Sequence, residues 1–261
     1  MPMKESWNGS EGISRRQFLS PYEKDTIHRI VRLLILLLVT GIALSGVEIN
    51  AQVTQLPYVT ARDVDLLKLL PAPPPNDSPQ TKSELAQLLA IQATRTPAME
   101  ARCNADSVID VWRFSEIFGA KFTKEALPKL TSFFGRVVAS VGPVIDPAKD
   151  TWKRQRPHQQ SDLVKPSVSL SKSASYPSTS SAGAMLMAIV LANMVPEKRI
   201  EIMARGWEIG NNRIVGGIHF PSDVEAGRVS GTLIALSLMG RDDFKADFEA
   251  AKAELRAALG L

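Results

Sequence analysis

Cysteine is almost absent from this sequence of 261 residues, which contains only Cys103. A disulfide within the chain needs two cysteines, and structural zinc sites need cysteine clusters, so both are excluded. We expect Cys103 to be a small buried residue of the interior. Histidine is scarce as well, with His28, His158 and His219 far apart in the sequence, and no cluster of side chains suits a metal ion.

Runs of basic residues are also absent. The formal net charge is only +4 at pH 7, and the lysines and arginines are scattered among acidic residues. Nucleic-acid-binding proteins usually gather such residues into a patch or run, so we expect no nucleic-acid partner. The hydrophobic fraction of 44% is enough for a substantial core, and the length fits one domain with appendages.

The alternation of polar and apolar residues that marks half-buried strands is missing too. Apolar segments with helical spacing recur instead, and we therefore predict an all-α fold, a single-domain helical bundle. These segments are residues 107–118, 123–141, 183–195, 200–209 and 224–240.

The ends of the chain are predicted to lie outside this helical domain, which we assign to residues 52–240. Residues 241–261 are predicted to form an amphipathic helix that docks on the domain. Four apolar residues follow one another there at helical spacing. They are Phe244, Phe248, Ala251 and Leu255.

The first 51 residues differ from the rest of the chain. Residues 33–47 carry no charge and follow two arginines, Arg29 and Arg32. This stretch is short for a bilayer span, which takes about 20 residues, and suits the apolar core of a secretory signal. We predict that residues 1–51 are a signal peptide, cleaved after Ala51, or an uncleaved anchor in the inner membrane. In either case we expect the rest of the chain to be periplasmic or secreted.

Lys149 and Arg156 are the first pair of residues that suggest chemistry. They are seven positions apart, nearly two helical turns, so we predict that both lie on one helix face and that Pro157 ends the helix. Two fixed cations at one spot suit a phosphate, because the guanidinium offers paired donors and the ammonium a point charge. Taken alone, such a pair more often belongs to a solvated helix face.

Ser178 begins a second stretch, in which it follows Pro177 and precedes a long apolar helix. A hydroxyl here can cap the helix, and the backbone N–H groups of Thr179, Ser180 and Ser181 then point outward at the positive end of the helix dipole. Such an end is a ready anion site. A serine-capped helix without a ligand is nevertheless far commoner.

His219 lies in a third stretch together with Arg213 and Asp223. A neutral imidazole can attack phosphorus with one nitrogen if a carboxylate accepts the proton of the other nitrogen and fixes the tautomer. Asp223 is placed to supply that carboxylate. By itself, a histidine four positions before an aspartate is usually structural.

Taken together, the three stretches resemble the signature of the type 2 phosphatidic acid phosphatase superfamily, which the vanadium haloperoxidases share. The matching parts are residues 149–157, 177–178 and 213–223, in this order and spacing. Within the superfamily the chain is most similar to the class A bacterial nonspecific acid phosphatases. That similarity rests on "LLPAPP", "TPAMEARCNADS", "YPS" and "HFPSDVEAGR", and it spans residues 66–240.

The resemblance implies a helical, metal-independent acid phosphatase that needs no cofactor and acts on small phosphomonoesters. It implies that His219 is the nucleophile, which forms a phosphohistidine, and that Asp223 is its orienting partner. It also implies the residues that bind the phosphoryl oxygens. These are Lys149, Arg156, Ser178, Thr179, Ser180 and Arg213.

One departure from the family's pattern concerns the general acid. Where the family usually has Pro-Ser-Gly-His, this chain has Thr179 and Ser180 after the Pro-Ser pair. The family's histidine protonates the departing alkoxide, and a serine hydroxyl is a poor proton donor compared with an imidazolium. His158, next to the Arg-Pro pair, is a candidate replacement.

Three hypotheses follow. The one we favour is an active phosphomonoesterase with a displaced or absent general acid, because the nucleophile, its partner and the cations are retained. The second is a weakened relative that binds phosphate or phosphoesters without turning them over. The third is an accidental match in an exported helical protein, which the joint spacing makes remote. A vanadium haloperoxidase would also need the missing histidine.

Overall fold

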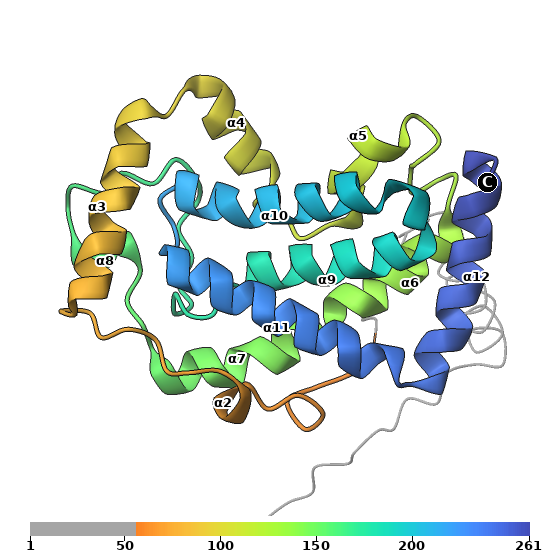
Figure 1. Ribbon diagram of the computed structural model, residues 1–261, viewed down its shortest axis with the longest axis horizontal. Helices are drawn as coiled ribbons and strands as arrows, with labels where there is room; N and C mark the ends of the chain where they lie inside the picture. The colour runs from red at the N-terminus through yellow and green to blue at the C-terminus, as the bar shows by residue number, and fades with distance from the viewer. Residues whose placement is uncertain (1–55) are drawn as a thin grey trace, which may run out of the picture. The chain divides into compact units, whose positions relative to one another are not determined.

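Helices make up the regular secondary structure of residues 56–261, the part of the chain that the computed structural model describes. The predicted all-α class is confirmed for this part (Figure 1). The predicted signal peptide or anchor, residues 1–51, lies outside the described residues. The helices are α2 (Leu66–Leu69), α3 (Pro79–Thr94), α4 (Pro97–Ala105), η1 (Val111–Phe114), α5 (Ser115–Phe118), α6 (Pro128–Ala139), α7 (Val141–Trp152), α8 (Pro157–Gln160), α9 (Thr179–Met194), η2 (Pro196–Lys198), α10 (Arg199–Val215), α11 (Pro221–Met239) and α12 (Asp242–Leu259).

Helix α9 forms the centre of the bundle. It lies between α10 and α11 and packs against both of them (Figure 1). Every residue from Ala182 to Ala188 is buried, so the helix is enclosed on all sides. A helix that is apolar all round needs such an enclosure, which is why the apolar run of residues 183–195 occupies the core. Within residues 56–261, no helix combines the length and the hydropathy that crossing a bilayer requires.

Helices α9 and α11 approach each other closely at Gly227. A Cβ atom at this position would lie 2.5 Å from the carbonyl oxygen of Ser178, closer than non-bonded atoms pack. Nearby, the backbone N–H of Ser178 donates a hydrogen bond of 2.9 Å to the carbonyl oxygen of Asp223. The starts of α9 and α11 are thereby held together, and these two starts carry the second and third motifs of the sequence.

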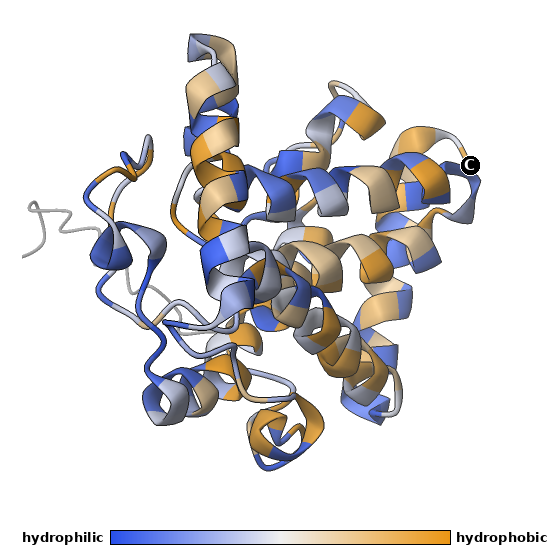
Figure 2. Ribbon diagram, turned by 60° about the vertical axis from the view of Figure 1, so that its left-hand side comes forward, coloured by the Kyte–Doolittle hydropathy of each residue, from blue (hydrophilic) through white to orange (hydrophobic). Residues whose placement is uncertain are grey.

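Helix α12 packs mainly against α6. Phe244, Ala251 and Leu255 are buried, as their helical spacing predicts, and Phe248 is partly buried. The ring of Phe244 meets the ring of Tyr58 edge-on, with 5.3 Å between the centroids. Figure 2 shows hydrophobic residues concentrated on the helices and hydrophilic residues prevailing in the loop segments beside the bundle.

Candidate active site

Lys149 and Arg156 do not share a helix face, so this prediction is wrong. Helix α7 ends at Trp152, and Lys153 takes the left-handed conformation, with a φ of 49°. Arg156 precedes a proline, which disfavours the helical conformation, and its φ of −80° and ψ of 159° are extended. Pro157 therefore begins α8 and does not end α7.

The two cations nevertheless meet, at the segment formed by Ser173 and Ala174. Nζ of Lys149 donates to the carbonyl oxygen of Ala174 at 2.6 Å. Arg156 donates from Nε to the carbonyl oxygen of Ser173 at 2.9 Å and from Nη2 to that of Ala174 at 3.4 Å. The side chains converge through a turn where the sequence had predicted a helix, and both are buried.

His219 contacts Arg156 with one ring nitrogen and Asp223 with the other. Nη1 of Arg156 lies 3.2 Å from Nε2 of His219, and Nδ1 of His219 lies 3.4 Å from Oδ2 of Asp223. A guanidinium has donors only, so the Arg156 contact assigns the lone pair to Nε2 and the proton to Nδ1. In this tautomer Nε2 is the nucleophilic nitrogen, and the N–H is directed at the carboxylate.

Burial keeps the imidazole of His219 neutral. Only 4% of the residue is exposed. Burial lowers the pKa of His219 to about 3, with a smaller contribution from the charge of Arg156, although the interaction with Asp223 acts in the opposite direction. The ring is therefore unprotonated even in acidic solution, and it is available as a nucleophile there.

Asp223 is fully buried and bound through both oxygens. Oδ1 accepts a hydrogen bond of 2.6 Å from Arg154, and Oδ2 accepts one of 2.5 Å from Oγ of Ser175 and one of 2.8 Å from the backbone N–H of Phe220. Burial raises the pKa of Asp223, but the interactions with His219, Arg154 and Ser175 outweigh burial and lower it below its ordinary value. The carboxylate is thus ionised and fixed in place.

The cations of the site lack anionic partners. Within the described chain, the hydrogen bonds of Lys149, Arg156 and Arg213 go to carbonyl oxygens, hydroxyls and the imidazole, and none goes to a carboxylate. Burial, then repulsion by Arg156, lowers the pKa of Lys149 to about 8. Burial also lowers the pKa of Arg156, to about 10. Desolvated cations without a counter-charge form a site that an oxyanion would stabilise.

Arg213 supports His219 through its backbone. Its carbonyl oxygen accepts the backbone N–H of His219 at 3.3 Å. Its Nη1 donates to the carbonyl oxygen of Cys103 at 3.2 Å and to Oγ of Ser107 at 2.9 Å. Cys103 is buried, as predicted. Nε of Arg213 is buried without a hydrogen-bond partner in the described part of the chain.

Ser178 caps helix α9, as predicted. Its Oγ accepts the backbone N–H of Ser181 at 3.3 Å, so this group is not available to a ligand and one detail of the prediction is corrected. The N–H groups of Thr179 and Ser180 belong to the first helical turn, where they have no partner within the helix. They lie at the positive end of α9, and both residues are partly exposed.

His158 lies in α8, directly after the Arg-Pro pair. Its Nδ1 is buried, and none of the described residues accepts or donates a hydrogen bond there. Burial and the charge of Arg156 lower the pKa of His158. The ring is near Arg156, but no described hydrogen bond joins it to His219, and its role as a replacement acid stays a prediction.

Sequence reasoning missed Arg154, Glu84 and Ser175, all of which belong to the hydrogen-bond network around Asp223. Arg154 bridges Asp223 and Glu84 with its two terminal nitrogens, at 2.6 Å and 3.1 Å. No spacing rule marks these residues, because they come from the α7–α8 turn, helix α3 and the loop between α8 and α9. The position of Arg154 two residues before Arg156 was the only available signal.

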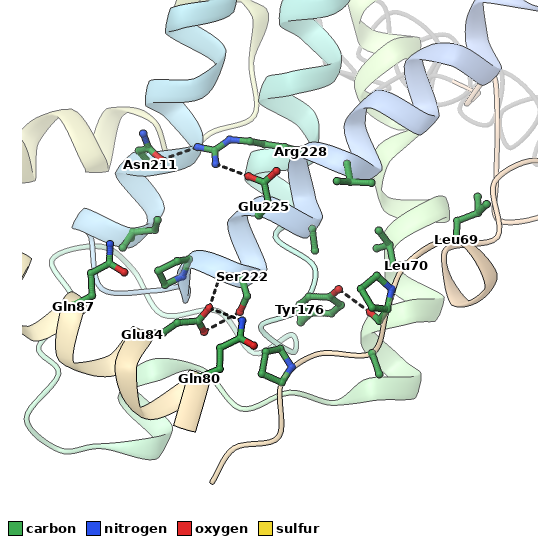
Figure 3. A pocket seen from close by; sticks show the side chains of 17 residues that line it. Leu69, Leu70, Gln80, Glu84, Gln87, Tyr176, Asn211, Ser222, Glu225 and Arg228 are labelled. Atoms are coloured by element: carbon green, nitrogen blue, oxygen red, sulfur yellow. Dashed lines mark hydrogen bonds and ion pairs between the residues drawn. The ribbon is translucent and has the colours of Figure 1, made fainter. Parts of the chain in front are cut away.

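A cavity of about 740 Å³ lies beside this network (Figure 3). Glu84 and Ser222 form part of its wall and are joined by hydrogen bonds, and Tyr176 and Arg228 line it farther along. His219 is not among the lining residues. The cavity is therefore separate from the imidazole.

The chain is similar to proteins of a known family. Residues 130–243 match the PAP2 superfamily. The chain is 30% identical over 202 residues to a non-specific acid phosphatase of Providencia stuartii, covering 73% of this chain and 81% of that protein. It is also 30% identical over 204 residues to an acid phosphatase of Zymomonas mobilis, covering 74% of this chain and 76% of that one.

The chain is also similar to solved structures. Among them is the first transmembrane PAP2 type phosphatidylglycerolphosphate phosphatase from Bacillus subtilis, with 21% sequence identity and a TM-score of 0.45. The match covers 64% of this chain and 89% of that one.

Proposed function

The chain belongs to the PAP2 superfamily and is an acid phosphatase of the bacterial non-specific type, and we propose that it hydrolyses small phosphomonoesters through a phosphohistidine on His219, without a metal ion. The observation that carries this proposal is the contact of 3.2 Å between Nη1 of Arg156 and Nε2 of His219. It joins a buried cation without a carboxylate partner to the lone pair of a neutral imidazole. A phosphoryl group bound by the cation would meet the nucleophile at the same place.

The reaction has two steps. Nε2 of His219 attacks phosphorus, the P–N bond forms, and the P–O bond to the leaving group breaks, so that its oxygen departs as an alkoxide and takes a proton from solvent. Asp223 stabilises the positive charge that develops on the ring, because Nδ1–H is directed at its carboxylate. Water then attacks phosphorus and gives up one proton to solvent, the P–N bond breaks, and phosphate leaves with the imidazole neutral again.

Charge stabilisation in both steps is assigned to the cations and to one helix end. Lys149, Arg156 and Arg213 would bind the phosphoryl oxygens, with the backbone N–H groups of Thr179 and Ser180 at the start of α9. Phosphoryl transfer asks mainly for positioning and electrostatic stabilisation, so these groups could serve where other phosphatases use metal ions.

Protonation of the leaving oxygen is the weak point of the site. Ser180 stands at the position of the family's usual histidine, and a hydroxyl does not replace an imidazolium as an acid. The alternative function is therefore a weakened relative that holds phosphate or phosphoesters without turning them over. The replacement of that histidine by Ser180 favours this alternative.

Phosphate release from a panel of aryl and alkyl phosphomonoesters, measured in excess chelator, separates the two functions. We expect the purified protein to release phosphate under these conditions and to be inhibited by vanadate, which forms five-coordinate adducts. A requirement for added magnesium or zinc would contradict the metal-free mechanism. Binding of phosphate without any release would support the alternative.

We also propose that the phosphatase domain works outside the cytoplasm, in the periplasm or after secretion. The uncharged stretch of residues 33–47 after two arginines supports export. Cell fractionation of the expressed full chain tests this, and the mass of the exported protein tells a signal peptide cleaved after Ala51 from an anchor. Activity confined to the cytoplasm would contradict the proposal.

A further inference from the structure

We propose that Arg154, held by Glu84, is a positioning residue that fixes the orientation and the effective charge of Asp223. This inference rests on the proposed function of His219. Arg154 is not among the residues that the family resemblance assigns to phosphate binding, and its guanidinium contacts the carboxylate of Asp223.

Arg154 binds Oδ1 of Asp223, whereas His219 faces Oδ2. Nη1 donates to Oδ1 of Asp223 at 2.6 Å and to Oγ of Ser222 at 2.7 Å, and Nη2 donates to Oε2 of Glu84 at 3.1 Å. The guanidinium carbon also lies 4.4 Å from the ring centroid of Phe220, the residue that follows His219. Arg154 thus touches the segment 220–223 at three points.

Glu84 in turn fixes Arg154. Besides the ion pair, Oε2 of Glu84 accepts the hydroxyl of Ser222 at 2.8 Å, and Oε1 accepts the backbone N–H of Ser222 at 3.1 Å. Figure 3 shows these bonds at the wall of the cavity. Only 1% of the Arg154 side chain and 10% of the Glu84 side chain are exposed. A buried guanidinium between two carboxylates is held in one orientation. Its hydrogen bond to Oδ1 then fixes the orientation of Asp223.

The charge of Arg154 has a second effect, on the protonation of His219. An unpaired carboxylate beside a histidine favours the imidazolium and raises its pKa. Arg154 partly neutralises Asp223 and lowers the pKa of that carboxyl. Asp223 therefore raises the pKa of His219 less than an unpaired carboxylate would. His219 thus stays neutral and nucleophilic in acidic solution.

NMR titration of His219 tests this effect without relying on turnover. The chain has three histidines, so ring-labelled protein gives few signals, and His28→Ala and His158→Ala assign His219 by elimination. We expect Arg154→Met to raise the pKa of His219 by about one pH unit or more, because the positive charge next to Asp223 is lost. Arg154→Lys keeps the charge and should leave the pKa close to that of the wild type.

Arg136→Met is the matched control. Arg136 also pairs with two carboxylates, Asp243 and Asp247 of α12, and lies 3.8 Å from the ring centroid of Tyr58. Its loss removes contacts of the same kinds, none of which involves His219. We expect Arg136→Met to change stability and to leave the pKa of His219 unchanged.

Kinetics complete the test. Misplacement of Asp223 should lower kcat in Arg154→Met on the order of 10²-fold, and Arg154→Lys should recover part of this loss. If Arg154→Met, like Arg136→Met, leaves the pKa of His219 unchanged, Arg154 is only structural and the inference is overturned. If Arg154→Met shifts this pKa but the wild-type protein hydrolyses no phosphomonoester, the coupling stands and the proposed function fails.

Discussion

Nη1 of Arg156 lies 3.2 Å from Nε2 of His219. A cation this close to a histidine nitrogen would repel an imidazolium, so the contact and the burial of the ring favour the same neutral state. It also places the nucleophilic lone pair against a donor that an incoming phosphoryl oxygen can engage. The same contact therefore supports the binding of an oxyanion and keeps the imidazole of His219 neutral.

His219→Ala should abolish turnover, because no other imidazole in the described chain contacts both Arg156 and Asp223. Phosphate should still bind, since Lys149 and Arg213 also remain in the site. Phosphate release and calorimetric titration with phosphate measure the two effects separately. Wild-type rates in this variant would remove His219 from the nucleophile's role.

Oxyanion affinity should fall as the pH rises through about 8, the value to which burial lowers the pKa of Lys149. Below this pH Nζ is charged and attracts an anion, and above it the charge is lost. The inhibition constant of sulfate, whose own charge is fixed over this range, should rise by up to about tenfold per pH unit.

Lys149→Arg is the matched variant for this prediction. Its guanidinium stays protonated, so sulfate affinity should become nearly independent of pH between neutral and mildly alkaline solution. Equal pH dependence in both proteins would show that another group titrates.

Ser180→His should restore a general acid at the start of α9. General acid catalysis is worth about 10²- to 10⁴-fold, so rates on alkyl phosphates should rise by part of that factor. Aryl phosphates should gain little, because their leaving groups need no protonation. Rates on both classes, plotted against leaving-group pKa, measure the effect.

Two outcomes would contradict this prediction, and the first would be seen in the wild-type protein itself. If it hydrolyses alkyl and aryl phosphates equally fast, another residue already acts as the acid, and His158→Ala is the next variant to measure. If Ser180→His changes neither rate, more than a proton donor is missing and the binding function gains support.

Gly227→Ala should destabilise the fold by about 1–3 kcal/mol, because its Cβ would lie 2.5 Å from the carbonyl oxygen of Ser178. Activity should fall as well, since the contact joins the starts of α9 and α11. Urea unfolding measures the free energy. Gly240→Ala, whose Cβ would have its nearest neighbour at 3.6 Å, should stay within about 0.5 kcal/mol of the wild type. Equal losses in both variants would contradict the close-approach explanation.

The sequence predicted the parts of this site that depend on periodicity or short spacing. The buried helix α9, its Ser178 cap and the proximity of His219 to Asp223 all follow from local rules. The helix through Arg156 was predicted wrongly, because Lys153 takes the left-handed conformation and Pro157 begins a new helix.

The network behind Asp223 could not have been predicted. Glu84 and Arg154 meet across 70 positions of sequence, and Ser175 reaches Asp223 from the loop before α9. These contacts join α3, the α7–α8 turn and the loop before α9 to the start of α11. No local pattern encodes them.

Acid-sensitive phosphoryl trapping tests the central proposal most directly. The protein is mixed with an aryl phosphate, quenched in alkali within the first turnovers, digested and analysed by mass spectrometry. We predict one phosphoryl group on the peptide that contains His219, stable in alkali and lost in acid, as a phosphoramidate is. Phosphate released through an intermediate on Ser178, Thr179 or Ser180, with His219 never modified, would contradict it.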